Sequence, residues 1–231
     1  SDALNAADQI EFSGGKKNTI NFEFVKGRLK ARYAPSSPQA SIRYFEQLSK
    51  ENPSNENKYA YLTALQGIGD FKKALILVDE LLSKYPKNLI LNITKSEIYL
   101  LAQELDKAKI QIEQVLKISP GNYPASIIKS NILSAQNKTI QAEEIVRELL
   151  ISKNNDPHLW MLLSEIQRSG KNILGYHLSR GEYYLLLGDL ENALNQFQFA
   201  LRLSSNSFQT SETIMTKIKY AQDRLGQKRG L

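Results

Sequence analysis

Residues 55–86 read NENKYAYLTALQGIGDFKKALILVDELLSKYP, and they contain two helical patterns separated by Gly69 and Asp70. Apolar residues recur at spacings of three and four in 55–68 and again in 71–85, which is the period of an amphipathic helix. Glycine suits a left-handed helix end, and aspartate suits the cap of the helix that follows. The stretch therefore predicts a helix–turn–helix unit closed by Pro86.

The same pattern recurs along the chain with a period of about 34 residues. Pro53, Pro86 and Pro120 close successive units, and apolar residues lie eight and five positions before each closing position. Twelve positions before it lies a small residue, in turn Ser41, Ala74, Ala108 and Ala142. A small residue allows two helices to cross closely. This combination resembles the tetratricopeptide repeat, which implies an all-α, α-α superhelix, or solenoid.

The repeat pattern gives an expected domain organisation. We expect a junction segment over 1–21 that trails from an absent upstream domain, a repeat array over 22–205 and a capping helix over 206–231. The expected units are about 22–53, 54–86, 88–120, 122–155 and 157–205. The last contains a phase shift, because the next good match after the unit at 157 starts at 174, only 17 residues later. Single hairpins cannot bury their apolar faces alone, so the units must stack.

The composition excludes several kinds of enzyme site. The chain has no cysteine, and its two histidines, His158 and His177, belong to no HExxH motif. Thiol nucleophiles and zinc sites with cysteine ligands are therefore excluded. Apolar runs reach at most five residues, too short for a membrane-spanning helix. We expect a chain that is not an enzyme, binds no metal or cofactor and does not insert into a membrane.

The net charge of +6 lies mainly toward the two ends of the chain, while 121–205 is neutral. Nucleic-acid binders usually concentrate basic residues on one surface. Lys26, Arg28, Lys30 and Arg32 form a short basic stretch, for which a solvated helix face is the ordinary interpretation and phosphate contact the rarer one. Nucleic acid is not expected as a partner.

Several short stretches resemble one family of repeat-containing proteases. They are SDALNAA at 1–7, FEFVKGRLKARY at 22–33, PGNYP at 120–124, DPHLWMLLSE at 156–165 and LSRGEYY at 178–184. These are similar to the C-terminal repeat domain of BepA/YfgC-like periplasmic zinc metallopeptidases of the HtpX-related class. The resemblance implies a parent with an upstream zinc endopeptidase domain, acting in outer-membrane protein quality control. It also implies a periplasmic location, although the composition fits the cytoplasm equally well.

In a repeat array the first helices of the units line a groove that can hold a polypeptide. On the 34-residue frame, the second, fifth, ninth and twelfth positions of each unit face this groove. The predicted groove residues are Tyr59, Thr63, Gln66, Ile93, Glu97, Asn131, Met161 and Glu165. Tyrosine and isoleucine suit apolar anchors, and asparagine can pair with a partner's backbone.

Two interpretations of function remain open. In the first, the array docks substrates or partners for a periplasmic metalloprotease and chaperone. Its partners would be polypeptide segments, such as outer-membrane proteins or their assembly machinery, and its own upstream protease domain. In the second, it is a free-standing adaptor or scaffold with no enzyme attached. The sequence also leaves open whether the concave or the convex face binds.

Overall fold

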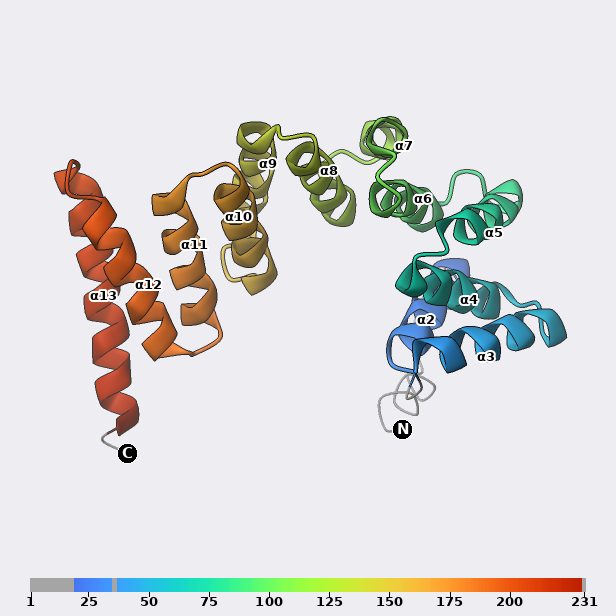
Figure 1. Cartoon of the computed structure of the whole chain (residues 1–231), viewed down its shortest axis with the longest axis horizontal. Helices are drawn as coiled ribbons and strands as arrows, with labels where there is room; N and C mark the ends of the chain where they lie inside the picture. The colour runs from blue at the N-terminus through green and yellow to red at the C-terminus, as the bar shows by residue number, and fades with distance from the viewer. Residues whose placement is uncertain (1–18, 35–36, 230–231) are drawn as a thin grey trace. The chain divides into compact units, whose positions relative to one another are not determined.

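The computed structural model describes residues 19–34 and 37–229, which form twelve α-helices and, within those ranges, no strand (Figure 1). Serine, asparagine or aspartate caps the start of most of these helices, as N-cap preferences predict. The helices are α2 (Thr19–Arg32), α3 (Pro38–Glu51), α4 (Asn55–Ile68), α5 (Phe71–Lys84), α6 (Leu89–Leu101), α7 (Leu105–Ile118), α8 (Tyr123–Ala135), α9 (Thr139–Ser152), α10 (Pro157–Ser169), α11 (Ile173–Leu186), α12 (Leu190–Leu203) and α13 (Phe208–Arg229).

The chain divides into two compact units, one ending at Pro120 and the other beginning at Gly121. In the N-terminal unit, α4 packs on α2, α3 and α5, and α6 packs on α5 and α7. In the C-terminal unit, α8 to α13 each pack on the next helix in the chain. Apart from α2, which packs on α4, the described helices of each unit pack on their neighbours in the chain, and the predicted all-α repeat fold is confirmed.

The turns inside the helical pairs share one backbone design. Each contains a residue with positive φ, namely Gly69, Gln103, Asn137, Lys171 and Gly188, so the spacing is 34 three times and then 17. In each turn the next residue donates its N–H to the carbonyl five positions earlier, at 2.8–3.0 Å. These are Schellman motifs, which satisfy the last carbonyls of a helix. Three of the five left-handed positions hold a residue other than glycine.

Helix α11 has such a turn at both of its ends. Lys171 lies in the turn from α10 to α11, and Gly188 lies in the turn from α11 to α12. Consistently, α11 packs extensively on both α10 and α12. It is therefore the second helix of one pair and the first helix of the next. This double role accounts for the 17-residue step in the sequence.

The core follows the small and apolar positions of the repeat. Ala74 and Ala108 in the N-terminal unit, and Ala142 in the C-terminal unit, have no exposed surface. At Gly181 an added Cβ would lie 2.3 Å from the ring of Phe197, which is also fully buried. The helices thus approach most closely where the sequence places its smallest residues.

Several predicted boundaries need correction. Helix α2 begins at Thr19, inside the range 1–21 expected for the junction segment, and residues 1–18 of that range lie outside the described part. Helix α7 begins at Leu105, and its N-cap is Glu104. The last expected unit contains three helices, and the predicted capping helix is α13. None of the described helices is long and apolar enough to span a bilayer.

Candidate functional site

Tyr59 is not available to a partner, contrary to our prediction. Its side chain has no exposed surface and belongs to the core of the N-terminal unit. Its ring lies 5.2 Å from that of buried Phe24, and its hydroxyl lies 2.5 Å from Thr94 Oγ1. The prediction failed because α2 covers this face of α4. Tyr59 therefore stabilises the fold, and burial raises its pKa.

Helix α2 lies along groove positions of both α4 and α6. Gly27 allows the backbones of α2 and α4 to approach closely, because an added Cβ would lie only 2.4 Å from the carbonyl oxygen of Glu56. Asn55 Nδ2 donates to Glu23 at 2.9 Å, and Asn88 Nδ2 donates to Asn21 at 2.7 Å. Helix α2 thus occupies part of the surface that we predicted for a partner.

The basic stretch on α2 is directed at groove carboxylates. Lys26 and Lys30 pair with Glu56, and Arg28 pairs with Glu97 at 3.1 Å. Arg28 also donates to Tyr59 Oη at 3.1 Å, and its guanidinium lies 5.8 Å from the centre of that ring. Burial alone would lower the pKa of Arg28, but the Tyr59 hydroxyl and the Glu97 carboxylate outweigh it and raise the pKa. The ordinary interpretation as a solvated face is therefore wrong for these three side chains.

The remaining predicted groove residues of this unit are partly accessible. Thr63, Gln66 and Ile93 are half-buried, and the Thr63 hydroxyl donates to the Tyr59 carbonyl at 2.9 Å. A small cavity of about 210 Å³ lies at the end of α2, lined by Arg28, Arg32, Thr63, Gln66, Gly67, Glu97 and Leu101. Thr63, Gln66 and Glu97 thus share one cavity, whereas Ile93 does not line it.

The three predicted groove residues of the C-terminal unit are all half-buried. Met161 Sδ accepts a hydrogen bond from Arg180 at 2.8 Å, and Glu165 pairs with Arg168 at 2.6 Å. The amide of Asn131 makes no side-chain hydrogen bond to another described residue. Among the predicted polar groups of this unit, only Asn131 therefore keeps its full capacity for a partner.

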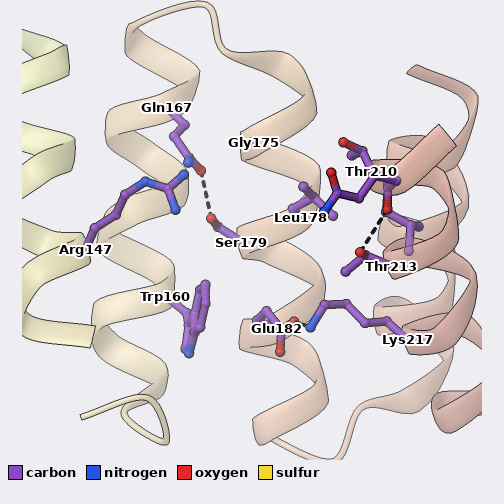
Figure 2. Close-up of a pocket in the computed structure, with 12 residues that line it drawn as sticks. Arg147, Trp160, Gln167, Gly175, Leu178, Ser179, Glu182, Thr210, Thr213 and Lys217 are labelled. Carbon is purple, nitrogen blue, oxygen red and sulfur yellow. Dashed lines mark hydrogen bonds and ion pairs between the residues drawn. The ribbon is translucent and has the colours of Figure 1, made fainter. Parts of the chain in front are cut away.

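A larger cavity of about 370 Å³ opens in the C-terminal unit, between α10 and α11 on one side and α13 on the other (Figure 2). Helix α9 contributes a single side chain, that of Arg147. The lining residues are Arg147, Trp160, Gln167, Gly175, Leu178, Ser179, Glu182, Gln209, Thr210, Thr213, Ile214 and Lys217. Its size lies in the range typical of ligand pockets. We call it the α10–α13 pocket.

Two polar networks frame the α10–α13 pocket. At one end, Glu143 accepts hydrogen bonds from Arg147 at 2.6 and 2.8 Å and from Gln167 at 2.9 Å. Gln167 in turn accepts from the Ser179 hydroxyl at 2.7 Å. At the other end, Glu182 on α11 pairs with Lys217 on α13, as Figure 2 shows. Both cations that line the pocket therefore already have a carboxylate partner.

None of the residues that line this pocket is among the predicted groove residues, although the repeat frame places three of them at groove positions. With a unit starting at Leu174, the second, fifth and ninth positions are Gly175, Leu178 and Glu182, and all three line the pocket. Trp160 and Gln167 of α10 wall it because α11 pairs with α10 as well as with α12. Because of the 17-residue step, α10 lies beside the groove positions of α11, and these positions line a cavity instead of an open groove.

The described residues contain no group of three or more histidine, cysteine, aspartate or glutamate side chains that could hold a metal ion. His177 Nδ1 instead lies 2.9 Å from Gln196 Oε1, and its ring stacks on Phe199. His158 lies in the exposed first turn of α10. Neither histidine lines either cavity.

Comparison with solved structures identifies the fold. A tetratricopeptide-repeat protein of Parabacteroides merdae matches with a TM-score of 0.53 and 16% identity, over 96% of this chain and 90% of that one. A thermophilic tetratricopeptide-repeat protein of Thermus thermophilus matches with a TM-score of 0.52 and 19% identity, over 86% of this chain and 98% of that one. The Cut9–Hcn1 hetero-tetramer of the APC/C matches with a TM-score of 0.55 and 16% identity, over 97% of this chain and 46% of that one.

These likenesses establish a tetratricopeptide-repeat fold. No family model matches the sequence, and no curated protein matches it.

Proposed function

We propose that this chain is a docking module that binds polypeptide segments through the α10–α13 pocket. The observation that carries the proposal is which residues line the pocket. Gly175, Leu178 and Glu182 occupy the positions that face the groove in a repeat array, and here they line a real cavity. Repeat arrays of this kind present extended binding surfaces to other chains.

The chemistry of the pocket suits a polypeptide. Trp160 and Leu178 offer apolar surface, whereas Gln209, Thr210 and Thr213 offer amide and hydroxyl groups along α13. A peptide presents the same two kinds of surface, because apolar side chains alternate with backbone N–H and C=O groups. Anchoring side chains in well-packed pockets supply most of the energy in such interfaces.

Peptide selection against the folded protein tests this proposal. A random peptide library is selected on the unsubstituted protein and counter-selected on a Thr213→Phe variant, whose added ring would fill the pocket. Thr216→Phe, at another exposed position on α13 outside the pocket lining, is the matched control. We expect peptides that bind the unsubstituted and control proteins but not the Thr213→Phe variant. Peptides that bind all three proteins equally would overturn the pocket as the docking site.

We further propose a specific setting for this module, namely the C-terminal domain of a periplasmic zinc metallopeptidase that acts on outer-membrane proteins. The support is the sequence resemblance of segments such as 22–33 and 156–165 to that family. The test is the natural gene: an upstream HExxH-coding segment in the same reading frame is expected. A reading frame with no such segment would instead favour the free-standing adaptor.

A further inference from the structure

We infer that the α10–α13 pocket takes an uncharged aromatic side chain of its polypeptide partner. This inference rests on the proposed function and names the anchor that the site would select. It follows from three properties of the pocket: the pairing of its charges, the arrangement of its apolar surface, and the hydrogen-bonding capacity left on its rim.

The charges of the pocket are already paired. Arg147 uses its Nε and one terminal nitrogen on Glu143, and Lys217 pairs with Glu182. A carboxylate ligand would have to compete with these glutamates for the two cations, and a cationic ligand would have to compete with the cations for the glutamates. Replacing one partner of a formed ion pair gains little, because the displaced charge must be resolvated. A neutral ligand leaves both pairs intact.

The apolar surface is shaped by a fixed aromatic residue. The indole N–H of Trp160 donates to the Asn154 carbonyl at 2.7 Å, which holds the ring in place at the pocket wall. Leu178 and fully buried Ile214 line the pocket from α11 and α13. Figure 2 labels Trp160 and Leu178 among the residues that line the pocket. Aromatic rings gain from contact with one another beyond the burial of their area.

The rim on α13 keeps hydrogen-bonding capacity for a peptide backbone. The side-chain amide of Gln209 makes no hydrogen bond to another described residue, so it has both donors and acceptor sites to offer. The Thr213 hydroxyl donates to the Gln209 carbonyl at 2.9 Å, which leaves its oxygen free to accept. A backbone N–H and C=O beside the anchor can therefore pair with α13 while the ring enters the pocket.

Trp160 can report ligand binding in the pocket, because it is the single tryptophan of the chain and it lines the pocket. One indole N–H resonance is therefore expected in an amide-correlation NMR spectrum. The probes are N-acetyl-phenylalaninamide, N-acetyl-aspartate amide and N-acetyl-lysinamide. We expect the phenylalanine probe to shift the indole resonance in a saturable way, with at least tenfold tighter binding than either charged probe.

The variants separate pocket binding from other contacts. Thr213→Phe should weaken the phenylalanine probe at least tenfold, and Thr216→Phe should leave its affinity within about twofold, a difference of under ~0.5 kcal/mol. Thr210→Phe provides a second pocket-filling variant, and thermal melting establishes that each variant is folded.

Two outcomes would overturn the inference. One is a charged probe that binds as tightly as the phenylalanine probe, and the other is an indole resonance that no probe moves. Neither outcome decides the docking proposal, because selected peptides with a charged or aliphatic anchor that are still lost on Thr213→Phe would preserve docking at this pocket.

Discussion

Two glycines of the C-terminal unit lie in opposite surroundings, and substituting each with alanine should change stability in opposite directions. At Gly181 the new Cβ would lie 2.3–2.8 Å from three ring atoms of buried Phe197, whereas at Gly226 it meets nothing within 4 Å. Overpacking of this kind costs about 1–3 kcal/mol. Glycine in a helix interior is less stable than alanine by roughly 0.5–1 kcal/mol.

We therefore expect Gly181→Ala to lower the free energy of unfolding by about 1–3 kcal/mol and Gly226→Ala to raise it slightly. Urea titration followed by circular dichroism measures both. A Gly181→Ala variant as stable as the unsubstituted protein would contradict the close approach of α11 to α12.

The left-handed turn at Lys171 gives a second prediction about a single residue. Its φ of 60° strains any residue that has a Cβ, by about 1 kcal/mol or more. Lys171 is exposed and forms no ion pair with another described residue, so its side chain can be removed without loss. Lys171→Gly should raise the free energy of unfolding by about 0.5–1 kcal/mol.

The control for this prediction is Lys171→Ala, which keeps the strain and should leave the free energy of unfolding nearly unchanged. If alanine stabilises the protein as much as glycine does, the gain comes from losing the lysine and not from relieving the backbone.

At the scale of elements, one hydrogen bond joins the start of α8 to the start of α10. The Tyr123 hydroxyl donates to Asp156 Oδ2 at 2.5 Å, and Asp156 Oδ1 also accepts from the N–H of His158. Burial, together with the nearby carboxylate, raises the pKa of Tyr123 to about 12. Burial alone would raise the pKa of Asp156, but the bonds from Tyr123 and the α10 backbone outweigh it and lower the pKa.

These pKa directions fix the pH dependence of stability. Unfolded tyrosine loses its proton near pH 10, and folded Tyr123 keeps it until about pH 12, so its contribution is complete below pH 10 and is lost as the pH rises toward 12. The free energy of unfolding should fall less steeply over this range in Tyr123→Phe. Equal slopes for the two proteins between pH 10 and 12 would contradict the assignment. The Asp156 contribution is lost in acid, as the pH falls below about 4.

The element scale also shows what the sequence could and could not predict. The helices α4 and α5, the turn at Gly69 and the buried alanines follow from local spacing, so the 34-residue period was sufficient to place them. The burial of Tyr59 could not be predicted in this way. It depends on α2, whose contacts with α4 and α6 join residues 31 to 69 positions apart in the sequence.

The α10–α13 pocket could be predicted from the sequence only in part. Its α11 residues are at groove positions of the frame that starts at Leu174, so the sequence contains their pattern. That they share a cavity with Trp160 of α10 and with residues of α13 depends on tertiary packing, which periodicity alone does not specify.

At the scale of the whole molecule, we expect the chain to bind no zinc stoichiometrically and to hydrolyse no peptide bond. The sequence has no cysteine and only two histidines, and the described residues contain no group of three or more histidine, aspartate or glutamate side chains that could hold a metal ion, whereas zinc sites in proteins need three or four protein ligands. Elemental analysis of the purified protein by mass spectrometry checks the first part, and incubation with unfolded casein checks the second. One zinc ion per chain would contradict the prediction.

Helix α11 also has a mechanical consequence. When a repeat protein is stretched from its ends, a separate helical pair can detach while its neighbours stay folded, because each unit contacts only adjacent ones. Neither pair that includes α11 can detach without removing a partner helix from the other. A single-molecule force trace should therefore show α10, α11 and α12 extending in one step, longer than the step released by α8 and α9.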